Sequence, residues 1–239
     1  IVEEIGAFLT FLGKASKAIF VPLIDRKLVF QHMEFIGVRS IGIIILAAIM
    51  IGAVFAIQFG SIFRLFGAES MVGAAASFAL SIELAPVITS FLVAGRAGSA
   101  MTAEIGSMRV NEQIDAMRVM AVNPISYLAS PRIVAAVMMT PLLSGLFLLT
   151  GIISAYIVAI YLFEIDQGIF LDKIKWISKS RHLSQGLFKA SIFGLIFSTV
   201  SCYKGFTTSG GAKGVGTATT QAVVVSLVAI LICDFFISY

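Results

Sequence analysis

Residues 82–124 read IELAPVITSFLVAGRAGSAMTAEIGSMRVNEQIDAMRVMAVNP. The first half of this stretch is compatible with lipid except for Glu83, whereas the second half is charged, amphipathic and too short to cross a bilayer. A carboxylate inside a membrane span is costly and is usually functional. Such a span, followed at once by a helix of the kind found in the cytoplasm, predicts a membrane machine coupled to a component outside the membrane.

The composition of the whole chain points to a membrane protein. Of its 239 residues, 59% are hydrophobic and only 13% are charged, too few charges for the surface of a soluble domain. A helix crosses a bilayer with roughly 20 apolar residues. Three uncharged runs meet this length, and two more are each interrupted by one ionisable group, Glu83 or Lys189. These runs are residues 40–63, 70–95, 133–163, 183–203 and 214–233. We expect an all-α integral membrane protein with five transmembrane helices, because lipid leaves backbone groups without other partners.

The remaining segments predict the domain organisation. Apolar residues on one face of 5–20 favour a helix lying in the membrane interface, followed by a basic connector over 22–39. Residues 166–181 are expected to form another interfacial piece, and 202–221 a glycine-rich connector. We expect a single domain over 1–239, in which 1–36 form the interfacial helix and connector and 37–239 the five-span bundle. The apolar run 5–12 is too short for a secretory signal.

A short helix is predicted over residues 111–121. Asn111 can cap its start, and the pair Asn123–Pro124 stops it. One face carries an apolar stripe, and the charged residues lie on the other faces. The stripe is Val110, Ile114, Met117 and Ala121, and the charged residues are Glu112, Asp115 and Arg118. The stripe must pack either on the ends of the chain's own spans or in a groove of a partner.

Four polar side chains are candidates to line a cavity within the membrane. Glu83 must face protein, water or a polar ligand, and the alternative is a helix-packing hydrogen bond near Pro86. Gln58 and Gln221 either line a cavity or bridge helices. Asp234 is the weaker case, because it is close enough to the C-terminus to reach the outer interface.

Small residues at Gly52, Ala56 and Gly60 repeat every fourth position of the first span. Such a repeat permits close helix contact, either inside the chain or between two copies. Neither a catalytic set of side chains nor metal-ligand spacing is visible, and GGAKGVGT lacks the spacing of a phosphate-binding loop. We therefore expect neither a catalytic nor a metal site, and a non-enzymatic subunit.

Lysine and arginine placement predicts the orientation. With the N-terminus inside, the inner side receives most of the 17 basic residues, although the basic loop before the fourth span opposes this bias. Five spans then place the C-terminus outside. The net charge of +4 is modest and lies beside the spans, so we interpret it as topology and expect no nucleic-acid partner.

Three segments closely resemble the MlaE (YrbE) permeases of ABC-type lipid transporters. They are ELAPVITSFLVAGRAGSAMTAEIGSMRVNEQIDAM, NPISYLASPR and CYKGFTTSGGAKGVGTATTQAVVVS. The resemblance implies an N-terminal interfacial helix, five spans and a homodimer in the bacterial inner membrane. It also implies two cytoplasmic ABC ATPases and a periplasmic MCE-domain protein as partners, and phospholipids as the substrate moved between the two membranes.

The resemblance also assigns roles to residues. The family's coupling helix, which inserts in a groove of the ATPase, matches 111–120 and so assigns this contact to Asn111, Glu112, Gln113, Ile114, Asp115, Met117 and Arg118. The family's intramembrane glutamate matches Glu83, beside a lipid cavity at the dimer interface. Two positions that are often basic in the family are Ile82 and Gln221 here, which puts a phosphate-binding role at either in doubt. ATP is expected on the partner ATPase, with no cofactor in this chain.

Two other classes compete with this interpretation. One is a channel or proton-coupled secondary transporter, in which Glu83 and Asp234 relay protons. The other is a structural membrane scaffold. Purifying the protein with its neighbours separates the three, since only the first requires an ATPase and bound phospholipid.

Overall fold

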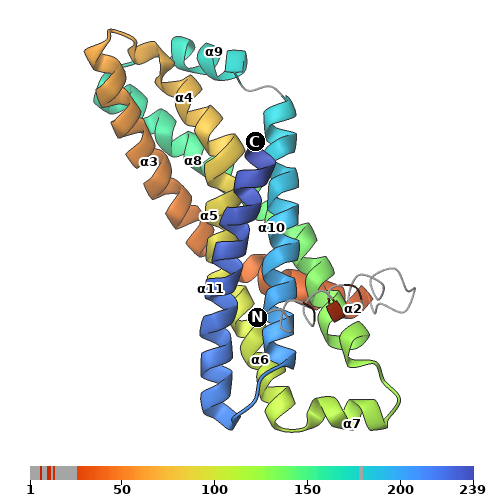
Figure 1. Ribbon diagram of the computed structural model, residues 1–239. Helices are drawn as coiled ribbons and strands as arrows, with labels where there is room; N and C mark the ends of the chain where they lie inside the picture. Colours follow the sequence, from red (N-terminus) through yellow and green to blue (C-terminus); the bar gives the residue numbers. More distant parts are fainter. Residues whose placement is uncertain (1–5, 7–9, 12, 14–25, 178–179) are drawn as a thin grey trace. The chain divides into compact units, whose positions relative to one another are not determined.

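The computed structural model describes residues 26–177 and 180–239, together with Gly6, Thr10, Phe11 and Gly13. All regular structure in these residues is helical (Figure 1). Five helices or runs of consecutive helices within the described part are long and apolar enough to cross a membrane: Arg26–Leu65, Glu69–Val110, Ile125–Phe163, Ser180–Phe206 and Gly211–Ser238. The prediction of an all-α, multi-pass membrane protein with five spans is confirmed.

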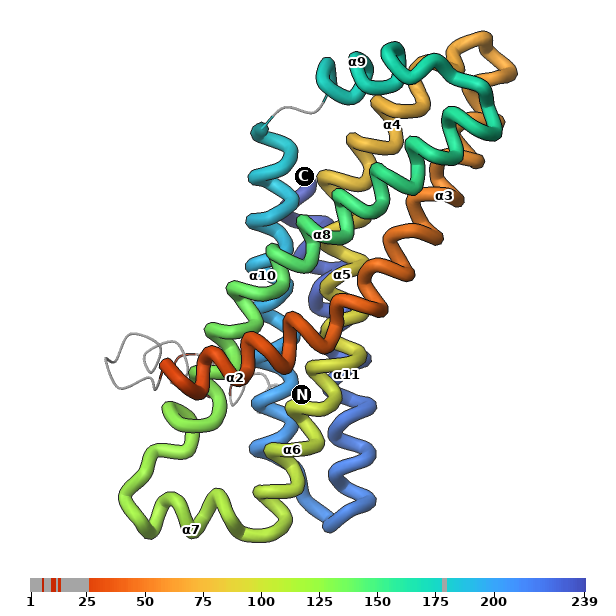
Figure 2. The backbone as a smooth tube through the Cα atoms, turned by 180° about the vertical axis from the view of Figure 1, so that it is seen from behind, coloured from red at the N-terminus to blue at the C-terminus, as the bar shows by residue number. Residues whose placement is uncertain are grey.

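The helices follow one another with short connections. The first two spans contain α2 (Arg26–Ile36), η1 (Val38–Ser40), α3 (Ile41–Leu65), η2 (Glu69–Met71), α4 (Val72–Ala79), η3 (Leu80–Leu84), α5 (Ala85–Val93), η4 (Ala94–Gly98) and α6 (Ser99–Val110). The short α7 (Gln113–Val119) follows directly on α6 (Figure 2). The remainder consists of η5 (Ile125–Ala129), α8 (Ser130–Phe163), α9 (Gln167–Ile177), α10 (Ser180–Phe206) and α11 (Gly211–Ser238).

The chain divides into two compact units. Unit 1 comprises Ile1–Ser40, Ser90–Thr140 and Ser191–Tyr239, and unit 2 comprises Ile41–Thr89 and Pro141–Ala190. Unit 1 therefore contains α7 and the turn between α10 and α11, whereas unit 2 contains α3, α4 and α9. The expectation of one domain over 1–239 remains a prediction.

In unit 2 the small residues of α3 pack against α8 of the same chain. A Cβ added at Gly52 would collide with the backbone of Gly151, and one added at Gly60 would collide with the ring of Phe163. Ala56 is fully buried in a cluster with other apolar side chains of unit 2. Of the two alternatives for this repeat, internal packing is therefore the one that the structure shows.

We expect Gly52→Val to lower the melting temperature, because an added side chain has no room against Gly151. Overpacking of this kind costs about 1–3 kcal/mol. Gly42→Val is the matched control, since it lies on the same helix and nothing lies within 4 Å of a Cβ built there. Thermal unfolding of both variants in detergent measures the difference, and equal melting temperatures would show that α3 does not pack on α8 as described.

Unit 1 is held together by helices that approach closely. The helix α11 lies beside α6 (Figure 1). The Thr102 hydroxyl on α6 donates a hydrogen bond to the Ser201 carbonyl of α10 at 3.0 Å, and Gly205 brings α10 against Ile105. Apolar side chains from both sides of α7, among them Ile105 and Ile133, join Ile114 in one buried cluster. The side chain of Ile114 on α7 is thus part of the core of unit 1.

Three π-helical segments, η3, η4 and η5, interrupt the second and third spans. Two of them end two residues before a proline, Pro86 or Pro131. Proline has no backbone N–H to donate to the carbonyl four residues earlier, so the preceding turn is free to widen. In η3 the Ala85 N–H accordingly bonds the carbonyl of Leu80, five residues back. Such π-bulges are frequent at functional sites, and η3 contains Glu83.

Four expectations about segments and their boundaries differ from the structure or reach beyond the described residues. Most of the expected connector 202–221 is helical, since α10 runs to Phe206 and α11 begins at Gly211. The helices of the second span do not end with the apolar run 70–95 but continue to Val110. The basic connector 22–39 forms α2 and η1 over its described part. Most of the interfacial helix expected over 5–20 lies outside the described residues.

Tertiary packing explains why the expected connector 202–221 is mostly helical. Glycine weakens an isolated helix by about 1 kcal/mol, which is why the glycine-rich sequence predicts a connector. In the structure Gly214 lies against the carbonyl of Ser209, where any side chain would collide, and α11 packs along α6. The glycine at this position permits the tight turn between α10 and α11.

Candidate functional site

Glu83 forms an ion pair inside unit 2. The Lys189 ammonium on α10 donates a hydrogen bond to Oε1 of Glu83 at 2.9 Å. The lysine side chain is 0% exposed and that of Glu83 is 42% exposed. A ligand can therefore reach the carboxylate but not the ammonium in this conformation. The pair joins the second and fourth spans, and it is the partner of Glu83 that sequence reasoning missed.

The local fold brings these two side chains together. Gly186 lies one turn before Lys189 on α10, and a Cβ there would collide with the carbonyl oxygen of Ser81. The glycine thus lets α10 approach η3 closely enough for the lysine to reach Glu83. A signal for the pair was present in the sequence. Each residue is the one ionisable group in its apolar run, the two have opposite signs, and buried charges in membranes are usually paired.

The other cavity candidates are distributed over both units. Gln58 is exposed on α3 of unit 2, and its amide makes no hydrogen bond within the described residues. Asp234 lies half-buried near the end of α11, in unit 1. Gln221 also belongs to unit 1, where it accepts a hydrogen bond from the Lys204 ammonium at 3.4 Å. The four candidates are therefore not one contiguous cluster within either unit.

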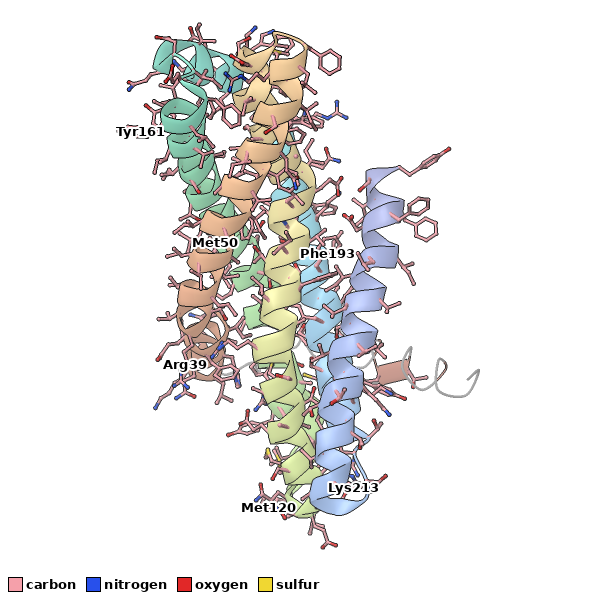
Figure 3. All side chains as sticks on the ribbon, turned by 90° about the vertical axis from the view of Figure 1, so that its left-hand side faces the viewer. Arg39, Met50, Met120, Tyr161, Phe193 and Lys213 are labelled. Carbon is pink, nitrogen blue, oxygen red and sulfur yellow. The ribbon has the colours of Figure 1, made fainter. Side chains whose placement is uncertain are left out.

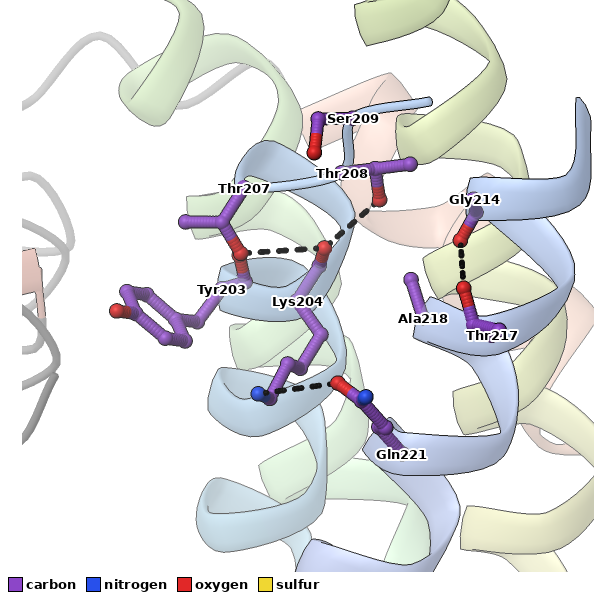
Figure 4. Close-up of a pocket in the computed structure, with 9 residues that line it drawn as sticks. All are labelled: Tyr203, Lys204, Thr207, Thr208, Ser209, Gly214, Thr217, Ala218 and Gln221. Carbon is purple, nitrogen blue, oxygen red and sulfur yellow. Dashed lines mark hydrogen bonds between the residues drawn. The ribbon is translucent and has the colours of Figure 1, made fainter. Parts of the chain in front are cut away.

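Gln221 lines a polar pocket between the end of α10 and the start of α11, which Figure 4 shows. The pocket has a volume of about 270 Å³ and is lined by Tyr203, Lys204, Thr207, Thr208, Ser209, Gly214, Thr217, Ala218 and Gln221. The hydroxyls of Thr208 and Thr217 donate to backbone carbonyls, each at 2.9 Å. Because these hydroxyls already donate, their oxygens can only accept further hydrogen bonds. The pocket therefore contains the ammonium group of Lys204 among hydrogen-bond acceptors.

The short helix α7 is fixed to unit 1 by one acidic residue. The Asp115 carboxylate accepts hydrogen bonds from Arg109 at 2.6 Å and from Arg118 at 2.8 Å. Ile114 is fully buried beneath it, and Met117 packs on the same cluster. Asp115 and Ile114 thus hold α7 in place, and are not free docking groups.

The ends of α7 differ from the sequence expectation. Asn111 does not cap the helix but ends α6, and Glu112 adopts a left-handed conformation (φ 58°) at the turn between the two helices. Asn123 caps the next helix instead, since its Oδ1 accepts a hydrogen bond from the Ile125 N–H at 3.0 Å. Two sharp turns, at Glu112 and at Ala121 (φ 59°), therefore define this segment.

The apolar surface that α7 exposes is not the predicted stripe. Val119 is 88% exposed and Met120 66%, and Val122 is exposed beside them. Of the predicted stripe, Ile114 is buried, and Ala121 is exposed at the turn. Met120 lies at the same end of unit 1 as Lys213 of α11 (Figure 3). For Ile114 and Met117, the structure shows the first of the two predicted alternatives, packing on the chain's own helices.

A second ion pair brackets α7 within unit 1. Arg132 on α8 bonds Glu104 on α6 at 2.9 Å and the Leu128 carbonyl at 2.7 Å, and its side chain is almost fully buried. The pair ties together the helix before α7 and the helix after it. No group of three or more metal-ligating side chains occurs in the described part of the chain.

The chain is similar to known proteins over most of its length. A family model described as permease MlaE matches residues 29–239. A probable ABC transporter permease protein of Synechocystis sp. is 41% identical over 232 residues, which cover 97% of this chain and 88% of that protein. A probable ABC transporter permease protein of Rickettsia felis is 36% identical over 236 residues, covering 99% and 91%.

A plant relative also aligns with most of the chain. Protein TRIGALACTOSYLDIACYLGLYCEROL 1, chloroplastic, of Arabidopsis thaliana is 40% identical over 208 residues, covering 87% of this chain and 59% of that protein. The family model, over residues 29–239, includes the last four of the five spans and most of the first.

Proposed function

From the premise that this chain belongs to the MlaE permease family, we propose that it is the membrane subunit of an ATP-driven transporter that moves phospholipids between the inner and outer membranes. A separate cytoplasmic ATPase binds and hydrolyses ATP, so the chain itself needs no cofactor. A periplasmic MCE-domain protein accepts or delivers the lipid. The family assignment already makes the chain a transporter subunit.

The surface of α7 is the observation that carries the proposal. Large apolar side chains that are exposed outside the apolar spans mark interaction surfaces. Val119 and Met120 project from a helix that Asp115 and Ile114 hold rigidly on unit 1. The exposed Arg118 precedes them directly in the chain, and such a charge suits orientation of a docking partner. A rigid, apolar-tipped helix of this kind can transmit movement from an ATPase groove to α6 and α8.

Glu83 supports the lipid part of the proposal. Its carboxylate is half exposed near the middle of an otherwise apolar span, whereas its counter-ion is enclosed. A phospholipid combines large apolar tails with a polar head group, and a half-exposed carboxylate among apolar side chains can orient such a molecule. Gln58, Gln221 and Asp234 remain candidate lipid contacts.

A homodimer would enclose the lipid path. The last span, α11, is the least buried of the five, and between positions 224 and 236 its exposed residues are apolar: Val224, Val225, Val228, Leu231, Ile232, Phe235 and Phe236. Symmetric dimers are the commonest soluble assemblies, and two copies suit a small permease with five spans. Lipid covers whatever part of this face the second copy does not.

We expect single cysteines at Val224, Val228 or Leu231 to cross-link two copies in a background without Cys202 and Cys233. Cysteines at Gly52 or Ala56 should not cross-link, because these positions face α8 of their own chain. Gel mobility after oxidation of native membranes measures the product. No cross-link at any exposed α11 position, with the protein monomeric in lipid, would remove α11 as the dimer surface.

The charge distribution supports an inner-membrane location with a cytoplasmic N-terminus. The α7 end of unit 1 carries Arg109, Arg118, Lys204 and Lys213. Basic residues beside spans favour the cytoplasmic side. With five spans, the C-terminus then lies in the periplasm.

Affinity purification from native membranes tests the proposal. We expect an ABC ATPase, an MCE-domain protein and bound phospholipid to accompany the chain. The alternative is a proton-coupled transporter or channel that uses Glu83 as a relay. Flux driven by a pH gradient through the purified chain alone, with no ATPase in the complex, would support that alternative and contradict the proposal.

A further inference from the structure

Two arginines meet at the ring of Phe35 in unit 1. The guanidinium carbon of Arg96 lies 5.0 Å from the centroid of this ring, and that of Arg39 lies 5.7 Å from it. Arg96 also donates hydrogen bonds from NH1 to the Phe35 carbonyl at 2.8 Å and to the Ser40 hydroxyl at 3.0 Å. Residues from α2, η1 and η4 therefore hold Arg96 in a fixed position next to a second cation.

No carboxylate neutralises this pair within the described residues. The ion pairs of the described chain involve neither Arg39 nor Arg96, and the charged group that acts on Arg96 is Arg39 itself. The Nε and NH2 groups of Arg96 make no hydrogen bond to described residues, and they are not among the buried atoms without partners. Two guanidinium groups with open donors thus lie around the ring of Phe35, at an accessible position.

The surroundings of the pair specify the chemistry of a ligand. Guanidinium groups match the oxygens of phosphate in a bidentate geometry. An apolar side chain lies beside them, because Val38 is 59% exposed next to Arg39. A free anion would gain nothing from this apolar neighbour. A molecule whose phosphate is joined to an acyl chain contacts both.

We infer that Arg39 of η1 and Arg96 of η4 form, within unit 1, a binding site for the phosphate of a phospholipid that does not include Glu83. Arg96 provides the fixed half of the site, since Phe35 and Ser40 position it. Arg39 provides the adaptable half, since its side chain is exposed and makes no hydrogen bond within the described chain. Binding at this site does not require transport, so the inference goes beyond the proposed function.

Native mass spectrometry of the purified full-length chain in detergent tests the site. The first bound dioleoyl phosphatidylglycerol is titrated against wild type, Arg39→Gln and Arg39→Lys. We expect Arg39→Gln to weaken binding about tenfold, as for loss of one charged hydrogen bond, and Arg39→Lys to restore part of it. Arg64→Gln is the matched control, because Arg64 is an exposed arginine paired with Glu69. It should bind like wild type.

Further measurements distinguish a phospholipid from free phosphate and from a protein partner as the molecule that the two arginines bind. Dioleoylglycerol, which lacks phosphate, should not compete, and inorganic phosphate should compete only weakly. Inorganic phosphate that competes as strongly as the lipid would overturn the lipid assignment. Unchanged lipid binding by Arg39→Gln would overturn the site. If Arg39→Gln lost its co-purifying ATPase but kept its lipid binding, the two arginines would instead belong to a protein-docking surface. Binding that depends on Glu83→Gln but not on Arg39→Gln would overturn this inference while leaving the proposed function intact.

Discussion

Replacing Glu83 by leucine is expected to abolish phospholipid transport and to destabilise the protein. The substitution leaves the ammonium of Lys189 enclosed without its counter-ion. Breaking a fully buried ion pair costs about 3–5 kcal/mol, and the cost is smaller here because the carboxylate is half exposed. Glu83→Gln should perturb both properties less, since the amide oxygen still accepts a hydrogen bond. Thermal unfolding in detergent and lipid transfer in liposomes measure the two effects separately.

A double substitution separates stability from transport. Glu83→Leu combined with Lys189→Leu removes both charges, so we expect it to regain much of the stability lost in Glu83→Leu. Transport should remain lost, because the polar group that meets the lipid is absent. Normal transport by Glu83→Leu, or by the double variant, would show that Glu83 handles no lipid.

The second large effect is expected at the tip of α7. Val119→Asp combined with Met120→Asp should weaken ATPase binding about 100-fold or more and stop ATP-driven lipid movement. Burying a large apolar side chain contributes about 1.5–3 kcal/mol, and 1.4 kcal/mol corresponds to a factor of ten. The ATPase that co-purifies with the membrane-inserted chain measures the loss.

Ala116→Asp is the matched control on the same helix. It adds an acidic side chain at an exposed position of α7 that is outside the assigned ATPase contact, and it leaves Val119 and Met120 in place, so this variant should bind the ATPase normally. Reversing Glu112 and Asp115 to lysine is a poorer test, because Asp115 holds Arg109 and Arg118 and its loss loosens α7 itself. ATPase retained by the double aspartate variant would refute docking through this tip.

The sequence predicted the spans well, because a membrane span is a local property. Residues 40–63 and 133–163 contain no charge. Apart from Ser40, which ends η1, they fall in α3 and α8. The prediction of a connector over the glycine-rich segment 202–221 was wrong for the opposite reason. Its helical state depends on packing against α6, which local composition does not encode.

The site was less predictable because its contacts are not local. Lys189 follows Glu83 by 106 residues, and only the approach of α10 to η3 joins them. The repeat Gly52, Ala56 and Gly60 has the same pattern whether it packs on α8 or on a second copy. Periodicity likewise showed that Ile114 must pack on something, but not that its partner is the chain's own core.

The most direct test of the central claim is ATP-dependent movement of a labelled phospholipid in liposomes that contain the purified chain, its co-purified ATPase and the MCE-domain protein. We predict transfer that requires ATP, the ATPase and an intact α7 tip. Transfer that proceeds without the ATPase and follows an imposed pH gradient instead would contradict the account.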